Sequence, residues 1–180
     1  IGTSNDTAYG LTKANETSKN KNLTRFESIQ NNFSLLNPRF LDELSTVCKN
    51  ENISLLPYSP IGGGVLSGKY NNNFFPEDAR FTAYVKHENP RVQAQATRFV
   101  NDKTKEATAR YMSLAKEYGI SPVTLAVAYS KHFDFVASTI IEARNLSQVD
   151  ESLAAFKFKI DAELMKKIEE IQKGILYPMG

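Results

Sequence analysis

The feature that most constrains this chain is the alternation of short apolar segments with segments of helical spacing. Four apolar segments are predicted to be strands: Ile1–Thr3, Phe26–Gln30, Ile53–Leu56 and Phe135–Ile141. Strands that alternate with helices pair in parallel, so we expect an α/β protein, with either an open sheet or part of a (β/α)8 barrel. Sharing 180 residues among four strands gives about 45 residues per unit, which suits half of a barrel of about 250 residues.

Helices are predicted from apolar positions three and four residues apart and from residues that begin or end helices. They are expected over residues 7–20, 38–50, 102–118 and 161–174, from Pro122 through Tyr129, and from Asn145 or Ser147 to about Phe156. Ser121 followed by Pro122 is typical of a helix start. Residues 71–100 show no steady period, so a long loop is expected there, of the kind that often forms a lid or a binding loop.

A glycine-rich stretch follows the third strand, from Tyr58 to Tyr70, and contains three consecutive glycines and Lys69. Glycine lets the backbone come close to a ligand, and its N–H groups can converge on an anion. Lys69 would add positive charge, and Tyr58 would add a flat face for stacking. Such loops after strands are where α/β proteins bind phosphorylated ligands. The alternative is an ordinary turn between a strand and a helix.

Polar side chains follow the predicted ends of all four strands. They are Ser4 and Asn5, Gln30 and Asn31, Tyr58 and Ser59, and Arg144, Asn145 and Gln148. In a parallel barrel these ends lie on the one rim that carries active sites. Amide and hydroxyl groups there can hold a carboxamide, and Lys69, Arg80 and Arg144 can hold phosphates. Taken singly, each residue is better explained as a helix cap or a solvated charge, and it is the convergence of several strand ends that points to a site.

Composition narrows the remaining possibilities. A formal net charge of +2 argues against a nucleic-acid or membrane partner. Apolar runs are much shorter than a membrane span, and no signal peptide is visible, so we expect a cytoplasmic protein without membrane insertion. The single cysteine, Cys48, is expected to be a small core residue, and no Cys/His spacing suggests a metal site. The chain opens on what resembles the end of a strand, so it is expected to begin within a fold.

Four blocks of the chain, in this order, resemble the aldo-keto reductases. They are residues 1–5, residues 28–31 with 35–37, residues 58–61 with 64–70, and residues 140–148. The resemblance runs along the whole chain, ends with a Tyr177-Pro178 tail, and is closest to NADPH-dependent bacterial and plant members related to potassium-channel β-subunits. It implies a (β/α)8 TIM barrel that binds NADP(H), with this chain supplying about strands five to eight and their helices.

The resemblance also implies roles for individual residues. In the family, matching positions hold the nicotinamide carboxamide (Ser4, Asn5, Gln30), stack on the nicotinamide ring (Tyr58), form the pyrophosphate loop (Ser59, Pro60, Ile61, Gly62, Gly63), clasp the cofactor (Lys69, Arg80), and contact the adenosine and its 2′-phosphate (Arg144, Gln148, Glu151). Two positions depart from the family pattern. Glu142 stands where a glycine is usual, and Ser152 stands where an asparagine usually contacts adenine.

The family's catalytic Asp, Tyr, Lys and His come from strands one to four, which are not in this chain. Asp6 and Tyr9 imitate the family's Asp and Tyr signature, but they follow the strand-five block and lie too close together in sequence. His87 and His132 do not match the catalytic histidine and are expected to be solvated or structural. We therefore expect no catalytic residue in these 180 residues, and no turnover by them alone.

Three hypotheses follow from the sequence. The first is the cofactor-binding half of an NADPH-dependent reductase that acts on a small carbonyl substrate by hydride transfer. The second is a non-catalytic NADPH-binding sensor or partner-docking subunit of the channel β-subunit type. The third is a structural half-barrel, whose exposed edges would favour self-association.

Overall fold

The computed structural model describes residues 1–179, with residue 73 described by its backbone alone. Its centre is a parallel sheet of three strands in the order β1-β2-β3. The strands are β1 (Gly2–Ser4), β2 (Ser28–Asn32) and β3 (Ser54–Tyr58). Ile29 of β2 lies opposite Leu55 of β3, and both side chains are fully buried. The predicted α/β class is therefore confirmed, and the sheet in this chain is open.

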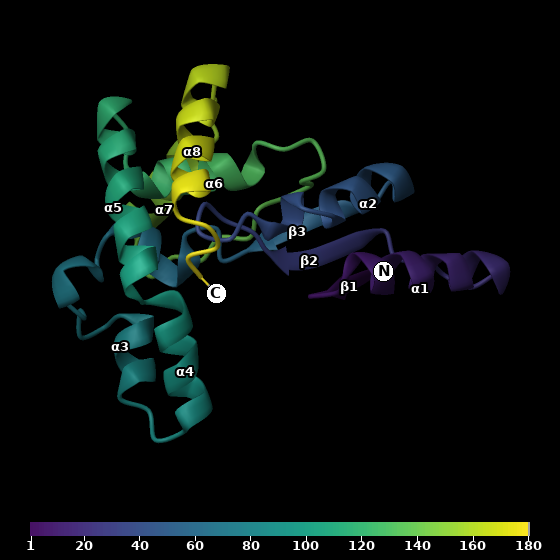
Figure 1. The fold of residues 1–180 in the computed structure, drawn as a ribbon, viewed down its shortest axis with the longest axis horizontal. Helices are drawn as coiled ribbons and strands as arrows, with labels where there is room; N and C mark the ends of the chain where they lie inside the picture. Colours follow the sequence, from purple (N-terminus) through teal and green to yellow (C-terminus); the bar gives the residue numbers. More distant parts are fainter. Residues whose placement is uncertain (180) are drawn as a thin grey trace.

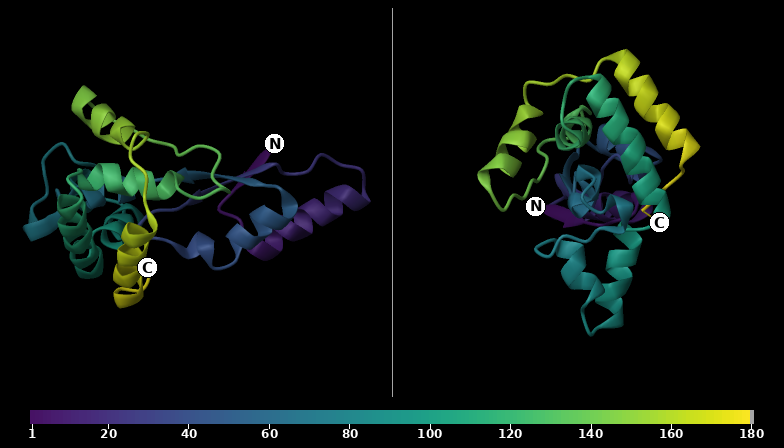
Figure 2. Two further views of the ribbon diagram at one scale, coloured as in Figure 1. Left: turned by 90° about the horizontal axis from the view of Figure 1, so that it is seen from above. Right: turned by 90° about the vertical axis from the view of Figure 1, so that its left-hand side faces the viewer.

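Helices lie around the sheet and extend from it at both ends. They are α1 (Ala8–Asn20), α2 (Leu44–Glu51), α3 (Arg80–Val85), α4 (Pro90–Phe99), α5 (Asp102–Glu117), α6 (Pro122–Lys131), α7 (Leu146–Ala154) and α8 (Ala162–Gly174), with short 3-10 helices η1 (Arg39–Leu41), η2 (Gly62–Ser67) and η3 (Asn71–Asn73). Helices α1 and α2 lie at the N-terminal end of the molecule, and α5 to α8 gather at the other end (Figure 1). Figure 2 shows α3 and α4 projecting on the side of the sheet opposite α7 and α8.

Most of the α-helices, but not α2 and α3, begin at a residue whose side chain accepts a hydrogen bond from the first turn. Ser121 accepts from the Thr124 N–H at 3.0 Å with Pro122 at the first position, as the sequence predicts. Asp161 likewise accepts from the Leu164 N–H at 2.8 Å at the start of α8. Helix α7 is capped by Asn145, which accepts from the Gln148 N–H at 3.0 Å. Local capping chemistry thus places the starts of these three helices.

The predicted fourth strand, Phe135–Ile141, is wrong as a regular strand. The segment runs beside β3 in parallel, where the Leu55 N–H donates to the Phe135 carbonyl at 2.7 Å and the Ala137 N–H donates to the Leu55 carbonyl at 3.0 Å. The next bond along a regular ladder would come from the N–H of residue 57. Pro57 has no N–H, so the ladder stops there, and pairing resumes only with a bond from Ile140 to the Pro57 carbonyl at 2.9 Å.

The prediction of a loop over residues 71–100 is also wrong. Much of this segment is a helical hairpin formed by α3 and α4. The second helix, α4, starts at Pro90, and the side chain of the preceding Asn89 accepts from the Arg91 N–H at 2.9 Å. An Asn-Pro pair is a helix-start signal. The expected apolar period is missing because α4 buries mainly one small residue, Ala96. A helix that buries so few side chains needs no continuous apolar face.

A cluster of aromatic side chains packs in the hydrophobic core. Phe33, fully buried, has its ring centre 5.5 Å from that of Tyr129, 5.4 Å from Phe133 and 6.1 Å from both Phe40 and Phe135. Phe40 belongs to η1, so the helix predicted over residues 38–50 is divided into η1 and α2, and the break lets Phe40 stack on Phe135. On α2, Cys48 is 1% exposed, which confirms its predicted place in the core.

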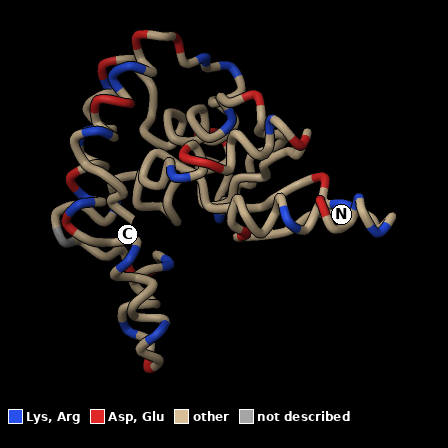
Figure 3. Tube along the Cα trace, turned by 45° about the vertical axis from the view of Figure 1, so that its right-hand side comes forward, with Lys and Arg blue, Asp and Glu red and all other residues tan. Residues whose placement is uncertain are grey.

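The surface carries charges of both signs, mixed along the helices (Figure 3). Within residues 1–179, no helix is both long enough and apolar enough to cross a membrane.

Candidate cofactor cleft

A cleft of about 810 Å³ lies beyond the C-terminal end of β3. Cavities of about 300–1,000 Å³ are typical of small-molecule and cofactor sites. Its walls come from the loop into η2, the residues before α3, one side of α6, and residues 140–152. Most of the site residues predicted from the sequence line it, namely Tyr58, Ser59, Pro60, Ile61, Gly63, Lys69, Arg80, Arg144, Gln148, Glu151 and Ser152. Segments far apart in the sequence therefore meet at one place.

Four predicted residues lie outside the lining of the cleft: Ser4, Asn5, Gln30 and Gly62. Gly62 is buried behind the loop, facing Leu36. The other three meet at the ends of β1 and β2, where the Ser4 hydroxyl donates to the Gln30 carbonyl at 2.9 Å. Gln30 contributes its backbone carbonyl to this contact. The predicted contact of its side-chain amide with a ligand stays a prediction.

Tyr58 joins this group to the cleft. Its hydroxyl donates to Asn5 Oδ1 at 2.9 Å, while the residue itself lines the cleft. Asn5 is in turn held by its N–H, which donates to Asn31 Oδ1 at 2.7 Å. Asn5 and Ser59 both have positive φ, +53° and +54°. Non-glycine residues in this region are uncommon and gather at functional sites.

The glycine-rich loop packs tightly, and at two of its glycines there is no room for a side chain. Gly63 has φ of +63°, and a methyl group on it would lie 2.7 Å from the Phe81 ring. At Gly64 a methyl group would lie 2.7 Å from Lys69 Nζ, so the lysine side chain rests against the loop backbone. The loop thus combines close backbone approach with a cation at its surface, which is the chemistry that an anion requires.

Gly63→Ala is expected to lower the free energy of unfolding, because it adds a clash with the buried Phe81 ring to the strain of positive φ. Gly119→Ala is the matched control, since Gly119 has φ of +67° and nothing within 4 Å of an added methyl group. The excess of Gly63→Ala over Gly119→Ala should be about 1–3 kcal/mol, the usual range for overpacking. Urea unfolding followed by circular dichroism measures both variants, and equal losses would contradict the tight packing of the loop.

Three cations gather at the cleft: Lys69, Arg80 and Arg144. Partial burial lowers the pKa of Lys69, and the nearby positive charges of Arg144 and Arg80 lower it further. Mutual repulsion of this kind is relieved by a bound anion, and guanidinium groups suit phosphate in two-point contacts. The cluster is therefore suited to an anionic ligand.

Gln148 orients one of these cations. Its Oε1 accepts from the Arg144 N–H at 2.8 Å, while its own N–H donates to Asn145 Oδ1. The predicted ligand contact of Gln148 is thus accompanied by a positioning contact that fixes the turn carrying Arg144. Ser152 is 4% exposed, and its hydroxyl donates to the Gln148 carbonyl at 2.9 Å.

Two bonds join opposite walls of the cleft. The Arg80 guanidinium pairs with the Glu142 carboxylate, and the Arg144 guanidinium donates to the backbone carbonyl of Asp78. Residues 78 and 80 precede and begin α3, whereas residues 142 and 144 precede α7. The residue that departs from the family pattern, Glu142, is therefore a partner of a cation at the site.

Sequence reasoning missed several residues that line the cleft. Val123 and Val127 of α6 form an apolar wall, and their spacing of four residues on one helix was a usable signal. Asp78 takes part through its carbonyl, which sequence patterns do not reveal. The remaining unpredicted lining residues are Ser67, Pro76, Ala79, Ile140, Ile141 and Ala143. Gly64 and Asn145, which also line the cleft, were noted in the sequence only as part of the glycine-rich stretch and as a polar residue after a strand, and Glu142 only as a departure from the family pattern.

The residues that imitate catalytic groups lie elsewhere. Asp6 precedes α1, where its Oδ1 accepts from the Thr7 N–H at 2.8 Å, and Tyr9 is 78% exposed. His87 accepts from the Asn89 N–H at 3.0 Å in the turn between α3 and α4, and His132 follows α6. These side chains are outside the cleft lining.

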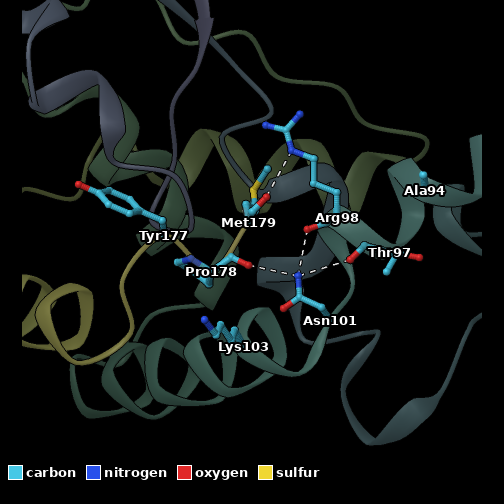
Figure 4. A pocket seen from close by; sticks show the side chains of 8 residues that line it. All are labelled: Ala94, Thr97, Arg98, Asn101, Lys103, Tyr177, Pro178 and Met179. Atoms are coloured by element: carbon cyan, nitrogen blue, oxygen red, sulfur yellow. Dashed lines mark hydrogen bonds between the residues drawn. The ribbon is translucent and has the colours of Figure 1, made fainter. Parts of the chain in front are cut away.

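A second pocket of about 590 Å³ lies beside the C-terminal tail (Figure 4). Asn101 Nδ2 donates to the Pro178 carbonyl at 3.1 Å, and Arg98 Nε donates to the Met179 carbonyl at 3.3 Å. The Tyr177 hydroxyl donates to Asp42 Oδ2 at 3.1 Å. The pocket shares no lining residue with the cleft, and these bonds anchor the tail to the body.

The sequence of this chain is similar to those of several known proteins. Protein tas of Escherichia coli K12 is 32% identical over 178 residues, which cover 99% of this chain and 49% of that protein. A putative aryl-alcohol dehydrogenase of Schizosaccharomyces pombe is 27% identical over 94% of this chain and 45% of its own. A putative voltage-gated potassium channel subunit beta of the same yeast is 29% identical over 63% of this chain and 32% of its own. The chain spans about half the length of the first two relatives.

A family model, the aldo/keto reductase family, matches residues 1–173. The family implies a (β/α)8 barrel, and an open parallel sheet with helices around it is consistent with part of one. The match covers nearly the whole sequence, and the chain therefore belongs to the aldo/keto reductase family.

Proposed function

We propose that this chain is the cofactor-binding part, about strands five to eight, of an NADP(H)-dependent oxidoreductase that reduces the carbonyl groups of aldehydes or ketones to alcohols. The observation that carries the proposal is the meeting of an aromatic residue, a glycine-rich loop and three cations in one cleft. A nicotinamide dinucleotide has a flat ring, a pyrophosphate and, in NADP(H), a further phosphate, and each has a chemical counterpart among these residues.

The residues present fit such a cofactor. Tyr58 offers a ring for stacking, and its hydroxyl bond to Asn5 fixes its position. The Gly64 N–H already donates to the Ile61 carbonyl at 3.0 Å, so we take the backbone at Gly63, which lines the cleft, to face the pyrophosphate, with Lys69 beside the loop. Arg144, held by Gln148, is placed to receive a phosphate near the adenosine. Val123 and Val127 give the cleft an apolar side.

In this proposal the chain binds and orients the cofactor, which supplies a hydride to the substrate when bound. Carbonyl reduction also needs a proton at the oxygen, given by a general acid. We assign no described residue to that task, since the Tyr58 hydroxyl already donates to Asn5. In this proposal the proton donor comes from strands one to four of the barrel, where the resemblance places the catalytic residues of the family.

The test is equilibrium titration of the full-length protein with NADPH, followed by NADPH fluorescence. Saturable binding and aldehyde-dependent oxidation of NADPH are expected. The 180-residue chain, checked for folding by circular dichroism, should show no turnover above background. Absence of saturable NADPH binding by the full-length protein would overturn the proposal, and turnover by the short chain would overturn the assignment of roles.

A second candidate is favoured by the potassium channel β-subunit relative. In that case the protein would bind NADPH as a sensor or as a docking cue for a partner, without reducing a substrate. Saturable NADPH binding by the full-length protein, combined with no oxidation across a panel of aldehydes and ketones, would favour this candidate over the reductase.

A further inference from the structure

The two bonds across the cleft use both of its guanidinium groups. Arg80 pairs with Glu142, and Arg144 donates to the carbonyl of Asp78, so the short segments 78–80 and 142–144 are joined twice. Each arginine lines the cleft while it makes this bond. A phosphate entering between the two segments therefore meets cations that already have partners.

The Asp78 carbonyl and the Glu142 carboxylate differ in how strongly they oppose the binding of an anion to the arginines. The Asp78 carbonyl is neutral, so Arg144 can turn to a phosphate without leaving a charge behind. Glu142 is a carboxylate, and a phosphate near Arg80 must both displace it and accept its repulsion. The side chain of Arg80 is 39% exposed and that of Glu142 is 71% exposed, so the pair is partly screened and its effect is moderate.

We propose that Glu142 is a specificity-determining residue that weakens recognition of the adenine-ribose 2′-phosphate, both by holding Arg80 and by adding a negative charge to the cleft wall that carries Arg144, the cation proposed to receive that phosphate. The inference rests on the proposed function, because it takes the cleft to be a dinucleotide site. A ribose with a free 2′-hydroxyl does not need Arg80, and a carboxylate can accept its hydrogen bond. In this proposal Glu142 lowers the affinity of the site for NADP(H) relative to its affinity for NAD(H).

The experiment compares two half-cofactors, 2′,5′-ADP and 5′-AMP, which differ by the 2′-phosphate alone. Their dissociation constants are measured by calorimetry on the full-length protein and on Glu142→Gln, which keeps the side-chain shape and removes the charge. Glu170→Gln is the control, because Glu170 is an exposed acid on α8 and lies outside the cleft lining. Circular dichroism checks that all three proteins are equally folded.

Glu142→Gln is expected to tighten 2′,5′-ADP binding by about twofold to fivefold and to leave 5′-AMP unchanged, as a partly screened ion pair predicts. The gain should shrink at about 0.5 M salt, where such charges are screened. Unchanged 2′,5′-ADP binding, or equal tightening of both ligands, would overturn the role of Glu142 and leave the dinucleotide site standing. Binding of neither ligand to any of the three proteins would overturn the proposed function and the inference with it.

Discussion

Phe33→Ala is expected to lower the free energy of unfolding by about 3–5 kcal/mol, the usual cost of removing a buried phenylalanine. Phe33 is fully buried and faces four other aromatic rings at centre distances of 5.4–6.1 Å. Those rings come from η1, from α6 and from the segment beside β3, so alanine leaves a cavity that no single element can close. The loss includes the aromatic contacts as well as the buried area.

The measurement is urea unfolding of the full-length protein, followed by far-ultraviolet circular dichroism. Phe74→Ala is the control, since Phe74 is 63% exposed and its removal should change the free energy of unfolding by less than about 0.5 kcal/mol. Similar losses in the two variants would show that the cluster around Phe33 does not organise the core.

Lys69→Met is expected to weaken NADPH binding by about tenfold to a hundredfold, the range for one charged hydrogen bond of about 1.5–3 kcal/mol. Lys69 rests against Gly64 in the loop and is the cation nearest to the backbone that would face the pyrophosphate. Burial and the charges of Arg144 and Arg80 lower its pKa, so the folded protein disfavours the charged amine. Removing that charge should therefore leave the free energy of unfolding unchanged or raise it.

Loss of affinity without loss of stability separates a binding role from a structural one. NADPH fluorescence titration gives the affinity, and urea unfolding gives the stability. Lys157→Met is the matched control, because Lys157 is exposed and lies outside the cleft lining. Unchanged NADPH affinity in Lys69→Met would remove Lys69 from the site, and equal weakening in both variants would indicate a general effect of net charge.

Much of the fold could be predicted because its signals are local. The helix starts at Ser121 and Asp161 depend on one side chain and the turn that follows it, so the local sequence is enough to predict them. The break in the fourth strand depends on Pro57, some 80 residues earlier, and on the pairing of two distant segments. That cause is tertiary, and the apolar pattern of residues 135–141 could not reveal it.

The candidate site divides in the same way. Residues at strand ends, such as Tyr58 and Arg144, could be found because parallel topology brings those ends together. The carbonyl of Asp78 and the pairing of Glu142 with Arg80 could not, since a backbone group has no sequence signature and the pair spans 62 positions. The role of α6 was missed because sequence reasoning did not single out Val123 and Val127, which line the cleft.

Pro57 has a consequence for how the cleft opens. Beyond Ala137, the wall that carries Glu142 and Arg144 is tied to β3 by one backbone hydrogen bond among the described residues, from Ile140. The opposite wall follows β3 directly and is buried at Val65 and Leu66. Segments with few backbone bonds open at a lower free energy than the rest of a protein. We therefore expect residues 138–143 to separate from β3 at a lower free energy than the three strands of the sheet separate from one another.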